Sequence, residues 1–476
     1  MTDWLNPPRP YSIAHRGASA YAPDCSLEAY EKAARLGADV WEVDIRSSSD
    51  GVLITYHDAT LPDGTPIGEL TAEEIAAMSE EQGVPAVPFE EVLHLAKAKG
   101  AGIYADIKDL AATLPTLAAL KAHGIEKAIL GAFNPEAARL LDGADCPYPR
   151  SVLVPIGVDP FDHARGADVI HLCWEHMDRP QDLLDPAFFA EADRRGQKVV
   201  LWHEEDPDRM ATLRTLPVLG ICSDRPELVH PFRPPADWPV GIVCHRGATE
   251  FAPENTVEAA HCAFAAGFDI VELDVHQTRD GALAVIHDVT FDRTTDGRGA
   301  VQWASGETLS KLDAGSWYTP HFRGHGIPSL DEILAVAKGY GGGLYVELKS
   351  ADPGRVLDAV TRHSMLDHCF FWSFNHSKLA EIRKLSADAR LMVRRQDYPT
   401  LDLALADLSP EVVEFATADD LTEFSQCRAG GAKPMIAYMG RDPATFDRIV
   451  EAKPDLVNLH FPFAFRDHLQ NTPPRA

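Results

Sequence analysis

The sequence predicts an α/β chain made of two tandem (β/α)₈ TIM-type barrels, and three observations lead to this prediction. A pattern of polar residues and glycines occurs twice, 230 residues apart. Within each copy, short runs rich in β-branched residues alternate with helical patterns, as in a parallel sheet covered by helices. A proline-rich stretch separates the copies, and each copy of about 235 residues has the usual length of one such barrel.

The repeat is an ordered copy of a whole domain and not a short solenoid unit. "HRGA" at residues 15–18 returns at residues 245–248, and the paired acidic residues of "WEVDI" return in "VELDV". Beyond the "HD" pairs at 57–58 and 287–288, the spacing between equivalent positions grows to 241. The second copy therefore carries eleven extra residues between its "HD" and its "EIL".

The junction between the copies is "HPFRPPADWP", residues 230–239. Its four prolines disfavour helix and indicate a stiff linker. We therefore expect two domains, residues 1–235 with the shorter insertion and residues 236–476 with the longer one.

Nine candidate strand runs follow one another in the second copy, one more than a barrel needs. They are "GIVCH", "DIVELDV", "LAVIHD", "LYVELK", "CFFWSFN", "ARLMVR", "VVEFA", "MIAYMG" and "LVNLH". The sequence does not reveal which run is surplus. An open doubly wound sheet is the alternative fold, but no G-x-G-x-x-G follows the first strand to favour it.

Composition and charge exclude several classes of function. The formal net charge of −28 argues against nucleic acid and against an anionic membrane surface, whose phosphates would repel the chain. No apolar run approaches the ~18 residues that indicate a membrane span, and the first residues lack the features of a signal peptide, so the expected location is the cytoplasm. The eight cysteines stand singly, which argues against zinc ribbons and redox dithiols.

Carboxylates and a lysine gather on two strands of the second copy. Glu272 and Asp274 lie two residues apart and so project from the same face of a strand. Glu347 and Lys349 repeat this spacing in "YVELK". Three neighbouring carboxylates repel one another unless a cation holds them, and oxygen ligands suit Mg²⁺ or Ca²⁺ better than zinc.

Histidines and an arginine complete this candidate site. His245 and His287 each close an apolar run, and strand ends of a barrel converge on one rim, where active sites lie. Two histidines can divide general acid and general base roles. Arg246 and the lysine suit a phosphoryl group. A metal, proton donors and acceptors, and phosphate ligands together indicate phosphodiester cleavage. Each element alone has a less specific explanation, such as a surface ion pair, but the whole set recurs in order in both copies.

The ordered motifs "HRGA", "PENT", "VELDV", "TRDG", "VIHD", "DRTTDGRG" and "LYVELK" resemble the glycerophosphodiester phosphodiesterase family. The resemblance covers the second copy from Val240 to about Asn375, and the first, more divergent copy from Ser12 to about Lys108. It implies (β/α)₈ barrels, a divalent metal (Mg²⁺ or Ca²⁺) and hydrolysis of glycerophosphodiesters to glycerol 3-phosphate and an alcohol.

The resemblance also implies a role for each motif residue. In the second copy the metal ligands would be Glu272, Asp274 and Glu347, the acid and base would be His245 and His287, and the phosphate ligands would be Arg246 and Lys349. In the first copy the metal ligands would be Glu42, Asp44 and Asp106, the acid and base would be His15 and His57, and the phosphate ligands would be Arg16 and Lys108. In the mechanism it suggests, one histidine deprotonates the glycerol 2-hydroxyl, which attacks phosphorus, and the other protonates the leaving alkoxide. The sequence leaves open which histidine takes which part.

The first copy departs from the family pattern in three places. "PENT" becomes "PDCS", the third carboxylate is the shorter Asp106, and the segments "DRTTDGRG" and "GSWY" are replaced by a shorter loop. The second copy has Tyr438 where a tryptophan is usual, whereas the first copy has Trp202.

Other functions stay open at this point. The first copy could be a non-catalytic binding or dimerisation module beside a catalytic second copy. A phospholipase D-like action on lysophospholipids would use the same metal site. A zinc amidohydrolase is disfavoured because no H-x-H follows the first strand of either copy. The expected partner is a small glycerophosphodiester, with no nucleic acid and no membrane insertion, and a homo-oligomer is left open.

Overall fold

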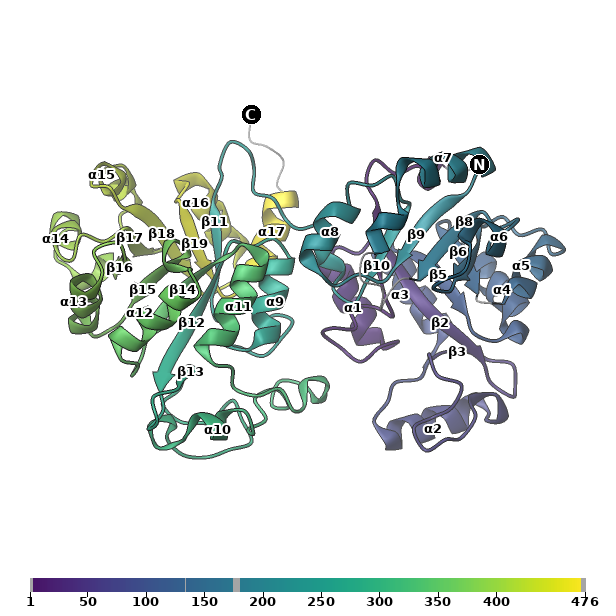
Figure 1. Ribbon diagram of the computed structural model, residues 1–476, viewed down its shortest axis with the longest axis horizontal. Helices are drawn as coiled ribbons and strands as arrows, with labels where there is room; N and C mark the ends of the chain where they lie inside the picture. The colour runs from purple at the N-terminus through teal and green to yellow at the C-terminus, as the bar shows by residue number, and fades with distance from the viewer. Residues whose placement is uncertain (1–2, 133, 174–179, 472–476) are drawn as a thin grey trace. The chain divides into compact units, whose positions relative to one another are not determined.

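The computed structural model describes residues 3–132, 134–173 and 180–471. The chain divides into two compact units, Met1–His230 and Pro231–Ala476. Each unit contains a closed barrel of eight parallel strands with helices on its outside (Figure 1). The predicted fold class is therefore confirmed, and the two barrels are called barrel 1 and barrel 2 below.

Barrel 1 closes through the pairing of its first strand with both its second and its last. Its strands are β1 (Tyr11–Ala14), β2 (Val40–Ser47), β5 (Gly102–Ile107), β6 (Ala128–Ala132), β7 (Arg150–Val154), β8 (Val169–Cys173), β9 (Lys198–Trp202) and β10 (Gly220–Ser223). Two short strands, β3 (Leu53–Thr55) and β4 (Val87–Pro88), extend the sheet in antiparallel fashion from the end of β2.

Barrel 2 closes in the same way. Its strands are β11 (Gly241–Cys244), β12 (Ile270–Gln277), β14 (Gly343–Leu348), β15 (Cys369–Trp372), β16 (Arg390–Arg394), β17 (Val412–Ala416), β18 (Lys433–Tyr438) and β19 (Leu456–Leu459). The surplus run is "LAVIHD": its strand β13 (Leu283–Val285) pairs antiparallel with the end of β12 and lies outside the barrel.

Helices connect the strands in both units. Barrel 1 has α1 (Leu27–Leu36), α2 (Ala72–Gln82), α3 (Phe89–Lys99), α4 (Thr113–His123), α5 (Pro135–Asp142), α6 (Pro160–His163), α7 (Pro186–Arg195) and α8 (Pro207–Leu213). Barrel 2 has α9 (Val257–Ala265), α10 (Gly306–Leu309), α11 (Leu330–Tyr340), α12 (Pro353–Arg362), α13 (His376–Leu385), α14 (Leu401–Ala406), α15 (Phe424–Ala429), α16 (Pro443–Ala452) and α17 (Pro462–Asn471).

Capping residues explain where many of these helices begin. Ser26 and Thr256 each accept a hydrogen bond from the backbone N–H three residues later, at the starts of α1 and α9. Thr71 and Ser329 form full capping boxes with the glutamates Glu74 and Glu332. Ser26 ends the "PDCS" segment and Thr256 ends the "PENT" segment, so these caps determine where each turn ends and its helix begins.

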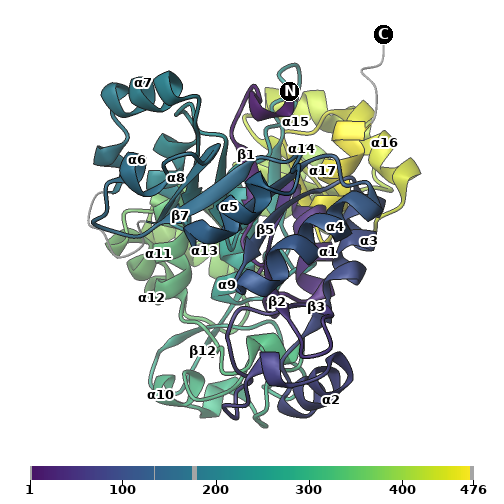
Figure 2. The same cartoon turned by 90° about the vertical axis from the view of Figure 1, so that its right-hand side faces the viewer.

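The insertion after each "HD" pair folds over a small apolar core of its own at one end of its barrel, where α2 and α10 lie (Figures 1 and 2). In barrel 1 this core contains Ile54, Leu61, Ile67 and Ile75. In barrel 2 it contains Ala284, Ile286, Phe291, Val301, Leu309, Ala314 and Ile327. The shorter loop of barrel 1 is therefore a packed structure in its own right.

Two expectations about the whole chain concern membranes and thiols. Among the described residues, no helix is long and apolar enough to cross a membrane. All eight cysteines are free thiols, and seven of them are buried, as is usual for cysteines that pack as small core residues.

Candidate active sites

The "HRG" turn at the end of the first strand places the first histidine and arginine of each site. The backbone N–H of His245 donates to the backbone carbonyl of Leu459 in the last strand. Arg246 then takes a left-handed backbone conformation with φ of 60°. Gly247 follows with φ of 86°, and a Cβ there would lie 2.7 Å from Ala259 on α9. The turn in barrel 1 has the same conformation, so glycine is required by both backbone and space.

The three predicted carboxylates of barrel 2 meet inside its rim. Asp274 on β12 and Glu347 on β14 are register partners, and Glu272 lies one step below on the same face. All three are buried, and one oxygen from each lies within 4.8 Å of the others. Burial and the neighbouring carboxylates raise the pKa of Glu272 well above its usual value and that of Glu347 to about 7. This crowding of negative charge is the electrostatic signature of a cation site.

Two cations of barrel 2 border the carboxylates. Lys349 Nζ lies 3.1 Å from Asp274 Oδ1 and also pairs with Glu347. Arg246 donates its backbone N–H to Glu272, and its guanidinium lies 3.5 Å from Asp274. Although burial raises the pKa of Asp274, these two cations lower it overall, so Asp274 is the carboxylate of the group that is held ionised.

The two histidines of barrel 2 have different partners. His287 Nδ1 lies 2.7 Å from Asp288, whose carboxylate is also held by the Arg293 guanidinium at 2.8 Å. His245 Nδ1 lies 3.1 Å from Nδ1 of His460, the residue that follows β19. Burial and the charge of Arg246 lower the pKa of His245 to about 3. His287 is therefore paired with a carboxylate, whereas His245 is held neutral.

Barrel 1 brings its predicted carboxylates together in the same way. Glu42, Asp44 and Asp106 are buried with one oxygen each within 4.8 Å of the others. Lys108 Nζ lies 2.8 Å from Asp44 and 2.6 Å from Asp106. The backbone N–H of Arg16 donates to the Glu42 carboxylate at 2.9 Å, just as the backbone N–H of Arg246 donates to Glu272 in barrel 2.

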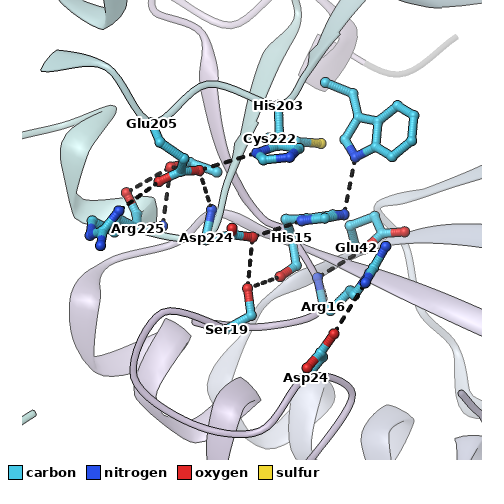
Figure 3. A network of polar contacts seen from close by, with 12 residues as sticks. His15, Arg16, Ser19, Asp24, Glu42, His203, Glu205, Cys222, Asp224 and Arg225 are labelled. Atoms are coloured by element: carbon cyan, nitrogen blue, oxygen red, sulfur yellow. Dashed lines mark hydrogen bonds and ion pairs between the residues drawn. The ribbon is translucent and has the colours of Figure 1, made fainter. Parts of the chain in front are cut away.

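The network around His15 differs from that around His245. Figure 3 shows His15 Nδ1 against Asp224, at 2.7 Å, with Ser19 donating to the same carboxylate oxygen. The indole N–H of Trp202 donates to His15 Nε2 at 3.0 Å. Because an indole can only donate, Nε2 must carry the lone pair and Nδ1 the proton. His15 is therefore the neutral Nδ1–H tautomer with both ring nitrogens engaged.

The second histidine of barrel 1 is less supported than its counterpart. His57 Nδ1 lies 2.7 Å from Asp58, but the two side chains are 40% and 71% exposed, against 32% and 29% for His287 and Asp288. In the part of the chain that the structure describes, Asp58 has no arginine partner like Arg293. Arg293 belongs to "DRTTDGRG", a segment that the shorter loop of barrel 1 lacks. Within its described residues, barrel 1 therefore has no equivalent of the ion pair between Arg293 and Asp288.

Strand register identifies which residues of the two sites are equivalent. Asp224 follows β10 as His460 follows β19, because Ala14 pairs with Ser223 and Cys244 with Leu459. By the same registers, the position of Trp202 is taken in barrel 2 by Ala437. Tyr438, expected at that position, instead packs its ring against Phe446 of α16. Barrel 2 therefore has no indole at the equivalent position.

Sequence reasoning missed three of these residues, namely Asp224, Arg293 and His460. A signal was present for two of them: Asp224 and His460 directly follow the last apolar strand run, just as His245 follows the first. Arg293 lies inside a quoted motif, but its contacts with Asp288 and Glu254 depend on how the insertion folds.

A pocket opens beside each group of residues. In barrel 1 it measures about 470 Å³ and is lined mainly by polar residues, among them His15, Ser19, His57 and Trp202. In barrel 2 it measures about 600 Å³ and lies between His287, Lys349 and three apolar side chains, Val289, Leu348 and Phe374. The two pockets thus offer different surfaces to the group attached to a phosphate.

His15, His203 and Asp224 also lie close enough to suggest a second metal site. The His15 and His203 rings, however, are stacked at 4.9 Å with an angle of only 15° between their planes. The lone pairs of a ring nitrogen lie in the ring plane, so two nearly parallel rings do not converge on one ion. This group is therefore better described as a hydrogen-bonded histidine–carboxylate pair.

The fold and these groups define a class: a (β/α)₈ enzyme whose rim carries buried carboxylates, paired cations and histidines suited to phosphoester chemistry. Comparisons with known proteins narrow the class. The sequence matches the Glycerophosphoryl diester phosphodiesterase family over residues 15–228 and again over 245–421. The chain therefore belongs to this family of phosphoric diester hydrolases, with one family region in each barrel.

Individual proteins and a solved structure are similar to parts of this chain. Glycerophosphodiester phosphodiesterase of Caldanaerobacter subterraneus subsp. tengcongensis is 35% identical over 192 residues, which cover 36% of this chain and 79% of that protein. YhdW of Bacillus subtilis is 50% identical over 110 residues, covering 23% of this chain and 44% of YhdW. The crystal structure of glycerophosphodiester phosphodiesterase from Agrobacterium tumefaciens str. C58 is 35% identical, with a TM-score of 0.46, and covers 48% of this chain and 99% of that one.

Proposed function

We propose that both barrels hydrolyse glycerophosphodiesters to glycerol 3-phosphate and an alcohol, each as its own domain (1–235 and 236–476). The observation that carries this proposal is the recurrence, at both rims, of a buried carboxylate triad flanked by one arginine, one lysine and two histidines. Burying three carboxylates together is costly, and barrel 1 buries its triad as barrel 2 does, which supports a working site in each.

The carboxylates fit a divalent cation. In barrel 2 the ligands would be Glu272, Asp274 and Glu347, and in barrel 1 Glu42, Asp44 and Asp106. Asp106 Oδ1 supports this fit, because among the described residues it is a buried carboxylate oxygen without a hydrogen-bond donor. All-oxygen donors suit Mg²⁺ or Ca²⁺. When bound, such an ion would offset the negative charge that develops on the phosphoryl oxygens.

Arginine and lysine would hold the phosphate. The Arg246 backbone is fixed by the turn and by its hydrogen bond to Glu272, which positions the guanidinium. Lys349 lies beside Asp274 and lines the pocket of barrel 2. In barrel 1, Arg16 and Lys108 would take the same parts. A guanidinium can bind two phosphoryl oxygens at once, and an ammonium adds a point charge.

The histidines would move the protons. In barrel 2 we assign the base to His245, which directly follows β11 beside the phosphate ligand Arg246 and would accept the proton of the glycerol 2-hydroxyl as that oxygen attacks phosphorus. His287 would be the acid, because the Asp288 carboxylate orients its ring through Nδ1, and it would donate to the leaving alkoxide oxygen. Water would then open the cyclic phosphate, with the histidine roles reversed. In barrel 1, His15 and His57 are the candidates for these roles.

The test is release of glycerol 3-phosphate from glycerophosphocholine, before and after chelation, by the wild type and by Glu272→Gln and Glu42→Gln. The proposal expects loss of activity on chelation, recovery with Mg²⁺ or Ca²⁺, and a reduced rate in each variant. Full activity after chelation, or in the Glu42→Gln/Glu272→Gln double variant, would contradict it.

One observation favours a second candidate, in which barrel 1 binds a ligand without turning it over. Its His15 is engaged at both nitrogens, and its His57 pair is largely exposed. In that case Glu42→Gln would leave the rate unchanged while reducing the affinity of barrel 1 for glycerol 3-phosphate.

A further inference from the structure

Three side chains of types that can ligate a metal lie together outside the active sites, between the outer helices α3 and α4 of barrel 1. Glu90 and His94 are one turn apart on α3 and so share one face of the helix. His123 is the last residue of α4, which packs beside α3 (Figure 2). One ligand atom from each lies within 4.8 Å of the other two, and none of the three lines the pocket of barrel 1.

The tautomer of His123 is fixed by the backbone. Its Nδ1 lies 2.9 Å from the Ala119 carbonyl, which can only accept, so Nδ1 carries the proton. In the neutral ring, Nε2 therefore presents its lone pair, and it does so 3.6 Å from a carboxylate oxygen of Glu90. Two acceptors face each other there, so a cation between them, either a proton or a metal ion, would join them. A backbone carbonyl that holds one nitrogen of a histidine is also the usual second contact of a metal-ligating imidazole.

The third side chain indicates that this cation is a metal ion and not only a proton. The rings of His94 and His123 are 4.9 Å apart at an angle of 67°, so their in-plane lone pairs can converge on one point, unlike those of the stacked His15 and His203. The Glu90–His123 separation is also close to the edge of a tetrahedron around zinc, roughly 3.4 Å for bonds of about 2.1 Å. The carboxyl end of α4, with its partial negative charge, favours a cation beside His123.

Barrel 2 supplies an internal comparison, because its helices α11 and α12 are equivalent to α3 and α4. Lys97 donates to the His123 carbonyl, and Lys338 donates to the His363 carbonyl in the same way. In barrel 2 the carboxylate is Asp331, which bonds His363 at 2.8 Å and also pairs with Arg362 at 3.1 Å. The pair is thus neutralised by a cation of the protein itself.

Barrel 1 differs from this arrangement at two positions. Ala122 stands where barrel 2 has Arg362, and His94 stands where barrel 2 has Ala335. The first difference removes the protein's own cation, and the second adds an imidazole. Among the described residues, the ion pair of Glu90 is with His123. These are the two changes that convert a salt bridge into a three-ligand site.

We propose that Glu90, His94 and His123 bind one transition-metal ion of the Zn²⁺ class on the outside of barrel 1 and so link α3 to α4. Two imidazoles and one carboxylate suit Zn²⁺ and neighbouring ions rather than Mg²⁺ or Ca²⁺, with water in the fourth position. The site is separate from the oxygen-only triads at the barrel rims, and its function is structural, because binding to the folded chain alone stabilises it.

The test is calorimetric titration of the full chain with Zn²⁺, with Mg²⁺ in large excess to fill the carboxylate triads. His94→Ala and His123→Ala should each bind one zinc ion fewer than the wild type and lose the zinc-dependent rise in Tm. The matched control, His363→Ala in barrel 2, should keep the wild-type count. Circular dichroism of the metal-free variants checks that these surface substitutions leave the fold intact.

A gain-of-site variant tests the comparison directly. Ala335→His/Arg362→Ala recreates the barrel 1 arrangement in barrel 2 and should add one zinc ion. The proposal is overturned if His94→Ala binds as many zinc ions as the wild type with the same affinity.

Discussion

The indole N–H of Trp202 donates to Nε2 of His15 at 3.0 Å, which occupies the only lone pair that this histidine could use as a base. The opposite nitrogen donates to Asp224 at 2.7 Å. In barrel 2 the corresponding positions hold Ala437 and His460, so His245 has no such indole partner. The two barrels carry the same set of charged side chains and histidines but differ in what surrounds the first histidine.

Replacing Trp202 with phenylalanine tests whether the indole restrains His15. If barrel 1 is active as proposed, Trp202→Phe in a His245→Ala background should raise kcat/KM roughly 2- to 10-fold, the equivalent of one net hydrogen bond of about 0.5–1.5 kcal/mol. Steady-state kinetics on glycerophosphocholine would measure this. A large fall in kcat/KM would show instead that the indole binds substrate.

Replacing Asp224 with asparagine tests the tautomer of His15. The amide can turn its N–H₂ toward Nδ1, which favours the other tautomer, in which Nε2 carries the proton and cannot act as a base. We expect kcat of barrel 1 to fall roughly 10²- to 10⁴-fold with little change in KM. In a His15→Ala background the same substitution should leave the rate of barrel 2 unaltered. Equal losses in both backgrounds would point to general unfolding.

Cys25 takes a left-handed backbone conformation, with φ of 58°, where barrel 2 has Asn255 with φ of 57°. Asparagine adopts this conformation at a lower energetic cost than cysteine does. The Asn255 amide also donates to Asp274 at 2.8 Å, whereas the Cys25 thiol lies 3.7 Å from Asp44. We therefore expect Cys25→Asn to stabilise barrel 1 by about 1 kcal/mol, measured by denaturant unfolding. The reciprocal Asn255→Cys should destabilise barrel 2, and a loss of stability in Cys25→Asn would contradict the reasoning.

His171 inside barrel 1 should make that barrel sensitive to acid. Burial lowers its pKa to about 3, from an unfolded value near 6.5. Between these values only the unfolded chain binds the proton, so stability is full above pH 6.5 and falls as the pH drops toward 3. The expected loss from pH 6.5 to 5 is about 2 kcal/mol, and His171→Gln should remove it.

The equivalent position in barrel 2 holds Glu414, which should act in the opposite direction. Burial raises its pKa to about 7, so it stabilises the fold at low pH and this contribution is lost as the pH rises from about 4.5 to 7. Thermal unfolding at several pH values, for the wild type, His171→Gln and Glu414→Gln, separates the two effects. An unchanged pH dependence in both variants would contradict these assignments.

The sequence was sufficient for the fold because the strand–helix alternation is a local pattern and the repeat presents it twice. It could not identify "LAVIHD" as surplus, since the antiparallel pairing of β13 with β12 depends on tertiary contacts. The prediction that Tyr438 takes the position of Trp202 was wrong for a related reason. The loop from Ala437 to the helix cap Asp442 is one residue longer than that from Trp202 to Asp206, so aligning the two sequences at these caps shifts the strands by one position.

The candidate site was predictable to a similar extent. The carboxylates, the lysine and the first histidine and arginine lie at strand ends, where alternation and barrel geometry fix their direction. The partners of the histidines could not be found in this way, because Asp224 and His460 reach them across the closure of the barrel, about 210 residues away.

The most direct test of two working sites is the rate of glycerol 3-phosphate release by four chains: wild type, His15→Ala, His245→Ala and the double variant. The proposal predicts that each single variant keeps part of the activity, with a different preference among glycerophosphodiesters, and that the double variant has none. If His245→Ala alone abolishes release from every diester, barrel 1 does not hydrolyse these substrates and the central claim is contradicted.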